Sequence, residues 1–245
     1  MKPCLAIPIY DHGGTIAGVV ESLAPFGLSC IVVDDGSGEA TRREIDLLEH
    51  RHAWVWVERH ARNLGRGAAL RTAYRAAARK GMTHVVQIDA DGQHAASDVP
   101  RLLEAAHAHP EALVLGAPIF DGSAPWLRLY GRKLSQAIVW LETLSTSVRD
   151  PLCGFRCIPL AATLEALGRA RTGDRMDFDP ELIIRLVRTG VPVVNVPTAV
   201  RYPENGISHF RLVRDNARIA WAYIRLASEL PWSQRPASAT KVRAS

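Results

Sequence analysis

The sequence predicts an α/β fold in which a mostly parallel central sheet is flanked by helices. Short apolar runs rich in valine and isoleucine recur along the chain, and stretches with the apolar spacing of helices separate them. The runs are almost continuously apolar, which is typical of parallel strands covered on both faces. The 245 residues, 47% of them hydrophobic, suit one large globular domain or two small ones.

The first half of the chain gives the clearest elements. Between two of the apolar runs, Leu70, Ala73, Tyr74 and Ala77 repeat at the spacing of one helix face, which predicts a helix over residues 67–80. Five runs are predicted to be strands, at residues 4–10, 30–35, 53–58, 84–89 and 112–117.

The second half mixes helices with shorter strands. A helix is predicted to open at Asp98, an N-cap candidate that is followed by Pro100 in the first turn. The other predicted elements are helices at 127–144, 178–190 and 210–230, a loop entering a short strand at 150–158, and a strand region at 191–203.

The composition of the chain limits where the protein can act and which ligands it can bind. No apolar run reaches about 18 residues, and the first residues lack the pattern of a signal peptide, so we expect a cytoplasmic protein without a spanning helix. Eight basic and three acidic side chains lie from Arg201 onward, which accounts for the whole net charge of +5. This local basicity favours an anionic partner near the C-terminus over a nucleic-acid ligand.

Three of the predicted strands end in polar residues. Tyr10 and Asp11 follow the first strand, Asp34 and Asp35 end the second, and Asp89 ends the fourth. The carboxyl ends of parallel strands meet at one edge of a sheet, and ligands of such sheets bind beyond that edge. The sequence therefore predicts a binding site there.

The segment "DADGQH" after the fourth strand carries two carboxylates one residue apart. Asp89 and Asp91 can converge on one divalent ion if the chain turns at Gly92, and Gln93 adds a neutral oxygen donor. Such oxygen donors select Mg²⁺ or Mn²⁺, and Mg²⁺ commonly shares its shell with substrate phosphates. The alternative interpretation is a solvated turn with no ligand.

Two further segments fit a nucleotide ligand. Asp34 and Asp35 can accept hydrogen bonds from a ribose hydroxyl or a base N–H, although capping of the next helix also explains them. The segment "NLGRGAAL", with Asn63 and Gly67, places two glycines before a helix and resembles a phosphate cradle. It lacks the lysine and threonine that end a P-loop.

Five segments occur in a characteristic order and spacing: "PIYDHGGTI" (8–16), "VVDDGS" (32–37), "NLGRGAAL" (63–70), "IDADGQH" (88–94) and "DPLCGFR" (150–156). Together they resemble family 2 glycosyltransferases, and the most similar branch is the dolichyl- and polyprenyl-phosphate sugar transferases. This resemblance implies the Rossmann-like GT-A fold and a transfer that inverts the anomeric carbon.

The resemblance also implies roles for single residues. Asp150 matches the acid that faces the transferred sugar, and Arg132 and Arg201 match basic positions near the phosphates. The positions that hold the nucleoside match Pro8, Tyr10, Asp11 and Asp35, and those for the metal ion and diphosphate match Asp89, Asp91 and Gln93.

Asp150 and Asp91 are the catalytic candidates. If the acceptor is a hydroxyl, Asp150 is the candidate general base; if it is a phosphate, Asp150 positions the sugar or balances the charge of Arg156. A carboxylate that caps its own loop is the structural alternative. Glu181 is a candidate for contacts with sugar hydroxyls, although compensation of a helix dipole explains it equally well.

The last predicted helix is basic and amphipathic. On a helical wheel Arg211, Arg214, Arg218 and Arg225 fall within about 60° of arc. This stripe is expected either to rest on anionic headgroups or to form the solvated face of a core-packed helix. The apolar residues on the opposite side are Leu212, Ile219, Ala220, Tyr223, Leu226 and Leu230.

We therefore divide the chain into a GT-A catalytic domain (1–208), a basic amphipathic helix (209–230) and a tail (231–245) with the composition of a disordered segment. The predicted activity is metal-dependent, inverting transfer from a UDP- or GDP-sugar to a lipid-linked phosphate or hydroxyl. Transfer would take place at the cytoplasmic face of a membrane to which the protein binds peripherally. The rival hypotheses are a sugar-phosphate nucleotidyltransferase and a nucleotide-binding module without activity.

Overall fold

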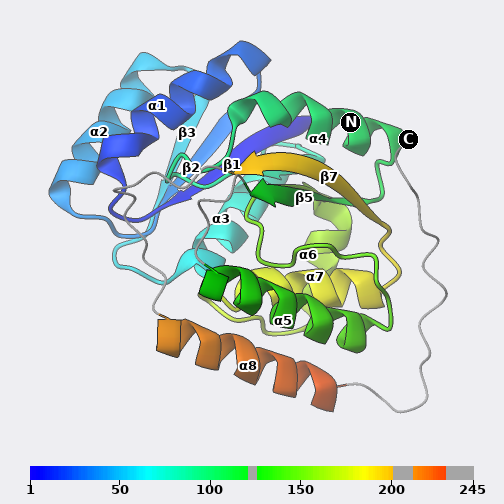
Figure 1. The fold of residues 1–245 in the computed structure, drawn as a ribbon. Coiled ribbons are helices and arrows are strands. Elements are labelled where there is room, and N and C mark those ends of the chain that lie inside the picture. The colour runs from blue at the N-terminus through cyan, green and yellow to red at the C-terminus, as the bar shows by residue number, and fades with distance from the viewer. Residues whose placement is uncertain (121–125, 201–211, 230–245) are drawn as a thin grey trace.

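The computed structural model describes residues 1–120, 126–200 and 212–229. Within these ranges, seven strands form one sheet in the order β3-β2-β1-β4-β6-β5-β7 (Figure 1). The strands are β1 Pro3–Ile9, β2 Cys30–Asp34, β3 Val55–Arg59, β4 His84–Gln87, β5 Leu113–Phe120, β6 Arg156–Pro159 and β7 Val193–Val200. The helices are α1 Gly13–Leu23, α2 Glu39–Arg51, α3 Arg66–Arg79, α4 Val99–Ala108, α5 Trp126–Thr143, α6 Leu160–Arg169, α7 Phe178–Arg188 and α8 Leu212–Ser228.

The predicted α/β class with a mostly parallel sheet is confirmed. The pairs β1–β2, β1–β4, β2–β3 and β5–β7 are parallel, and β6 runs antiparallel to both β4 and β5. Helices α1, α2 and α4 cover one face of the sheet, and α3, α6 and α7 cover the other (Figure 1).

The central strand β1 shows why its sequence is continuously apolar. Successive side chains of a strand point to opposite faces, and both faces of this sheet are buried. Cys4 and Ala6 therefore pack with α3, α6 and α7, whereas Leu5, Ile7 and Ile9 pack with α1, α2 and α4.

Strand register brings the predicted site residues to one edge. Ile9 at the end of β1 pairs with Asp34 at the end of β2, and Gln87 at the end of β4 pairs with Arg156. Because β6 is antiparallel, its first residue lies at the edge where its parallel neighbours end. The loop that precedes Arg156, which contains Asp150, therefore reaches the same edge.

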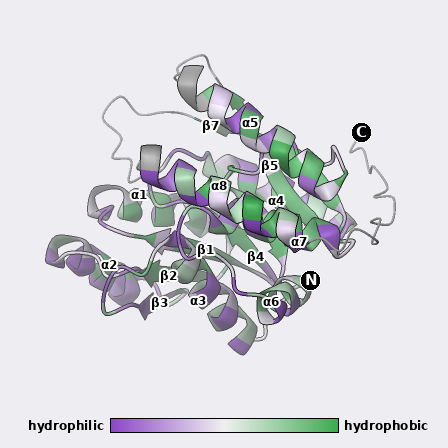
Figure 2. Cartoon of the chain, turned by 90° about the horizontal axis from the view of Figure 1, so that it is seen from below, coloured by the Kyte–Doolittle hydropathy of each residue, from purple (hydrophilic) through white to green (hydrophobic). Residues whose placement is uncertain are grey.

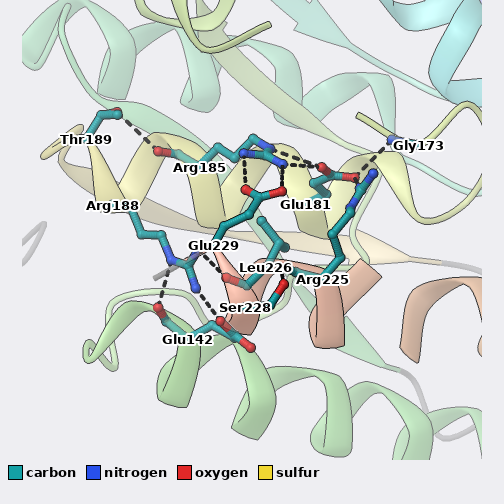
Figure 3. Close-up of polar contacts among 10 residues, drawn as sticks. All are labelled: Glu142, Gly173, Glu181, Arg185, Arg188, Thr189, Arg225, Leu226, Ser228 and Glu229. Atoms are coloured by element: carbon teal, nitrogen blue, oxygen red, sulfur yellow. Dashed lines mark hydrogen bonds and ion pairs between the residues drawn. The ribbon is translucent and has the colours of Figure 1, made fainter. Parts of the chain in front are cut away.

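Helix α8 is fixed to α7 by buried ion pairs (Figure 3). Glu181 of α7 is fully buried, and its carboxylate accepts hydrogen bonds from Arg185 (2.8 Å), Arg225 (2.5 Å) and the backbone N–H of Gly173 (2.9 Å). Arg185 also bonds Glu229, just past the end of α8 (2.9 Å). A charge this deeply buried is tolerated because every oxygen has a partner.

A second set of contacts connects α7 to α5 and α8. Arg188 pairs with Glu142 of α5 and donates a hydrogen bond to the carbonyl of Leu226 in α8 (3.0 Å; Figure 3). Burial raises the pKa of Glu142, and the positive charge of Arg188 opposes that rise. The three helices therefore pack against one another, with α7 between the sheet and the other two.

The amphipathic pattern predicted for the last helix is partly corrected. Ile219, Tyr223 and Leu226 are buried as expected, but Ala220 is exposed and Arg225 turns inward to Glu181. A helical wheel cannot foresee this, because the partner carboxylate lies 44 residues away. Arg211, Arg201, Leu230 and the predicted tail at 231–245 fall outside the described residues, as does the side chain of Leu212.

Helix length and hydropathy bear on membrane insertion. Among the described residues, no helix has the length and apolar content that crossing a bilayer requires.

We expect Glu181→Gln to lower the free energy of unfolding by about 2 to 3 kcal/mol, because it leaves two arginines without their buried countercharge. Glu165→Gln is the matched control, since Glu165 forms the same i,i+4 pair with Arg169 at an exposed site. It should cost less than about 0.5 kcal/mol. Urea denaturation measures both variants, and equal losses would contradict the stabilising role of the buried pair.

Candidate functional site

The loops after β1 and β2 are joined by side-chain hydrogen bonds. Oδ1 of Asp11 accepts from the N–H of Gly38 (2.7 Å), and the N–H of Asp11 donates to Oγ of Ser37 (3.1 Å). The N–H of Ser37 in turn donates to Oδ1 of Asp34 (2.8 Å). Asp11 has a φ of +52°, a left-handed conformation that is uncommon outside glycine and occurs often at functional sites.

The two adjacent acids at the end of β2 differ in their contacts: Asp34 is the last residue of the strand and Asp35 follows it. Asp35 accepts from the N–H groups of Leu64 (2.9 Å) and Gly65 (2.8 Å), and its Oδ1 lies 2.7 Å from Nδ1 of His60. It thereby holds the loop before α3 in place. Oδ2 of Asp34 is buried without a hydrogen bond, with Nε of Arg42 3.8 Å away. The nucleoside role of both acids stays a prediction.

Four alternating charges connect α3, the segment after β4, β6 and α7. Nη1 of Arg66 lies 2.5 Å from Oδ1 of Asp89, and its Nε donates to Oδ2 of Asp179 (3.0 Å). Nη1 of the fully buried Arg156 lies 3.4 Å from Oδ1 of Asp179. Arg66 therefore supplies part of the positive charge that the paired acids require.

Sequence reasoning missed Arg66 and Asp179. The segment "NLGRGAAL" drew attention to its glycines, although an arginine between two glycines at a helix start was the available signal. Asp179 lies two residues before Glu181, and only a three-dimensional structure shows that its side chain faces Arg66.

The two acids after β4 have opposite pKa shifts. Burial alone would raise the pKa of Asp89, but the charge of Arg66 and the nearby His94 outweigh it and hold that pKa well below its usual value. Burial raises the pKa of Asp91, and the negative charge of Asp89 raises it further. A cation between the two carboxylates would remove this penalty.

The donor set fits a hard divalent cation that shares its shell with a ligand. No group of three or more His, Cys, Asp or Glu side chains gathers as a metal site in the described part of the chain. The N–H of Gln93 donates to Oδ1 of Asp91 (3.0 Å), which fixes that carboxylate within the turn after β4. Two carboxylates with further oxygen donors from phosphates are a common arrangement for Mg²⁺, so the predicted ligands Asp89, Asp91 and Gln93 suit it.

A glycine lets the loop before β6 approach these acids. A Cβ at Gly154 would overlap Oδ2 of Asp89 and the guanidinium of Arg66. Hydrogen bonds to the sheet hold this loop in place. The hydroxyl of Tyr74 donates to Oε1 of Gln87 (2.7 Å), and Nε2 of Gln87 donates to the carbonyl of Gly154 (2.9 Å).

Asp150 lies in the same loop and is largely buried. Its Oδ2 accepts from Nη1 of Arg132 in α5 (2.6 Å), and its Oδ1 accepts from the N–H of Leu152 (2.9 Å). The proposed balance between Asp150 and Arg156 does not occur as an ion pair, since Asp179 is the acid beside Arg156. The predicted Asp150 and Arg132 are thus brought together.

Other predicted residues make contacts within the protein, and their ligand roles stay predictions. Pro8 is buried inside β1 and Tyr10 is half-buried just after it. Oδ1 of Asn63 accepts from Arg175 (3.0 Å), and a Cβ at Gly67 would overlap Phe178. Glu181 bonds α8 and Gly173, as described above, and Arg201 lies outside the described residues.

The chain is similar to glycosyltransferases both in sequence and in fold. The model of the family described as "Glycosyl transferase family 2" matches residues 4–161. A UDP-N-acetylglucosamine–dolichyl-phosphate N-acetylglucosaminyltransferase of Methanococcus voltae is 30% identical over 217 residues, which cover 82% of this chain and 86% of that protein. A polyprenol monophosphomannose synthase of Mycolicibacterium smegmatis is 29% identical over 84% of this chain and 80% of its own length.

Two solved structures have the same fold. One is glucosyl-3-phosphoglycerate synthase from Mycobacterium tuberculosis with Mn²⁺, UDP-glucose and glycerol 3-phosphate (TM-score 0.67, 21% identity, 95% of this chain and 82% of that chain). The other is a mannosyltransferase from Pyrobaculum calidifontis with GDP-mannose and Mn²⁺ (TM-score 0.67, 18% identity, 96% and 66%).

We expect Gly154→Ala to weaken Mn²⁺ binding about tenfold or more, because the added methyl group displaces Asp89 and Arg66. Isothermal titration with Mn²⁺ measures this directly. Gly168→Ala is the control, since a Cβ at that helical position meets open space. Unchanged Mn²⁺ affinity in a folded Gly154→Ala variant would remove Asp89 from the predicted metal site.

Proposed function

Because the chain belongs to glycosyl transferase family 2, we propose that it transfers a sugar from a nucleoside-diphosphate sugar to a lipid-linked acceptor with inversion at the anomeric carbon. The chain is a glycosyltransferase with the GT-A fold. The observation that carries the proposal is the pair Asp89–Asp91 beside Arg66, at the edge where β1, β2 and β4 end.

The donor would bind across this edge. The joined loops that contain Asp11, Asp34 and Ser37 would face the nucleoside, and the Asp89–Asp91 pair would face the diphosphate. Solved relatives of the same fold hold UDP-glucose or GDP-mannose, which supports a UDP- or GDP-sugar as the class of donor.

Mg²⁺ or Mn²⁺ held by Asp89, Asp91 and Gln93 would offset the negative charge that develops on the departing nucleoside diphosphate. The chain itself keeps Asp89 ionised, because Arg66 stabilises its carboxylate. Mn²⁺ in both solved relatives supports the same class of cation.

The acceptor would approach from the side of Asp150. If the acceptor is a hydroxyl, the Asp150 carboxylate removes its proton as the oxygen attacks the anomeric carbon. If the acceptor is a phosphate, no proton has to leave, and Arg132 would hold the phosphate while Asp150 orients the sugar. The bond between Arg132 and Asp150 keeps both groups in place for either role.

The names of the relatives favour a lipid-linked acceptor. They include transferases to dolichyl phosphate and undecaprenyl phosphate. An enzyme that uses such an acceptor works at a membrane, so peripheral association with the cytoplasmic face belongs to the proposal.

A thermal-shift screen of UDP- and GDP-sugars with and without Mn²⁺ tests the donor. A true donor stabilises the native state by mass action and should raise the melting temperature only when Mn²⁺ is present. Equal stabilisation without Mn²⁺ would favour the nucleotide-binding module. Incubating a sugar 1-phosphate with a nucleoside triphosphate tests the nucleotidyltransferase, and pyrophosphate release there would contradict the proposal.

We expect Asp150→Asn to lower turnover by about 10²- to 10⁴-fold while donor affinity changes little, because Asp150 acts on the acceptor or sugar and not on the nucleotide. Steady-state kinetics and donor titration separate the two effects. Asp46→Asn, at an exposed site paired with Arg59, should leave both values unchanged. Parallel losses of turnover and donor affinity would assign Asp150 to binding.

A further inference from the structure

Helices α5 and α8 lie side by side on one side of the molecule (Figures 1 and 2). A hydrogen bond between the hydroxyls of Ser135 and Tyr223 joins them, and the ion pairs of Figure 3 fix both to α7. The positions of α5 and α8 are therefore set by the fold, which also determines which of their side chains face outward.

The outward side chains of this helix pair are large and apolar. Figure 2 shows hydrophobic segments along both helices. The exposed residues are Tyr130 (65% exposed), Leu134 (53%) and Leu141 (73%) on α5, and Trp221 (67%) and Ile224 (62%) on α8. Together with Lys133 and Arg214 we call these residues the α5–α8 surface.

The apolar residues follow the helical repeat. At 100° per residue, Tyr130, Leu134 and Leu141 fall within about 40° of arc, and Trp221 and Ile224 lie about 60° apart. Single exposed apolar side chains are ordinary on a protein surface, but a stripe on each of two neighbouring helices marks an interaction site.

On α5 and α8 the described acidic side chains are buried, whereas the exposed charged side chains are basic. Glu142 and Asp215 are buried, and they pair with Arg188 and Arg218. Among the residues of α5 and α8 whose side chains are described, the exposed charged residues are Lys133 and Arg214. The exposed acid next to α8, Glu229, is neutralised by its pair with Arg185. An apolar stripe flanked mainly by positive charge matches an anionic lipid surface, where aromatic and aliphatic groups enter the interface and basic groups meet headgroups.

We propose that the α5–α8 surface docks on an anionic lipid bilayer. Trp221, Ile224, Leu134 and Leu141 enter the interface, and Lys133 with Arg214 lies at the headgroups. The inference rests on the proposed function and adds to it the surface that meets the membrane.

Docking in this orientation also places the proposed acceptor site near the membrane. The residue Arg132 of α5 turns inward to Asp150, while its neighbours Lys133 and Leu134 face outward. One short stretch of helix thus connects the membrane-facing side chains with the group proposed to handle a lipid-linked acceptor.

Vesicle co-sedimentation tests the docking. The full chain should bind vesicles of phosphatidylcholine with phosphatidylglycerol and bind pure phosphatidylcholine about tenfold more weakly. We expect Trp221→Ser with Ile224→Ser, and separately Leu134→Ser with Leu141→Ser, to weaken binding about tenfold. Leu47→Ser, an exposed leucine of α2, should bind like the wild type.

A second pair of variants tests whether the preference for anionic vesicles depends on Lys133 and Arg214. Lys133→Glu with Arg214→Glu should abolish the preference for phosphatidylglycerol. Arg43→Glu with Arg79→Glu changes the net charge equally on α2 and α3 and should keep it. If the wild type ignores anionic vesicles, or if control and test variants lose binding alike, the proposal is wrong.

A second copy of the chain is the competing occupant of this surface. Light scattering that shows a dimer for the wild type and a monomer for Trp221→Ser with Ile224→Ser would overturn the lipid assignment. Transfer to a water-soluble, short-chain acceptor keeps the two proposals separable. Normal transfer without vesicle binding refutes the docking alone, and vesicle binding without transfer refutes the proposed function alone.

Discussion

The ion pair between Arg66 and Asp89 is the contact on which the arrangement of the site depends. It lets a buried strand end in carboxylates, because the guanidinium stabilises the charged form of Asp89 while burial and Asp89 disfavour that of Asp91. The same guanidinium bonds Asp179, and Gly154 leaves room for both partners. The sheet edge, the loop before β6 and α7 therefore meet at one arginine.

Much of the fold follows from local pattern. Continuous apolar strands separated by helical stretches predicted the class and the edge at which polar residues gather, and the strand registers confirm that the ends of β1, β2 and β4 share it. The antiparallel direction of β6 was not predictable, since direction depends on which strands become neighbours. That direction brings the loop of Asp150 to the site.

The site was predictable as a set of segments but not as a set of contacts. Asp150 and Arg132 were both candidates, yet their mutual bond is a tertiary fact. Glu181 was considered for sugar contacts because of its position at a helix start, whereas its carboxylate is occupied by Arg185, Arg225 and Gly173. The same pairing turns Arg225 away from the predicted basic stripe and leaves Trp221 and Ile224 facing outward.

The central claim is that Asp89 and Asp91 hold a divalent cation against the diphosphate of the donor. A crystal structure of the protein grown with Mn²⁺ and a nucleoside diphosphate tests this most directly, since anomalous scattering locates manganese without ambiguity. We predict a manganese peak within bonding distance of carboxylate oxygens of Asp89 and Asp91 and of an oxygen of the diphosphate. A nucleotide bound at this edge with manganese absent or at a distant position would contradict it.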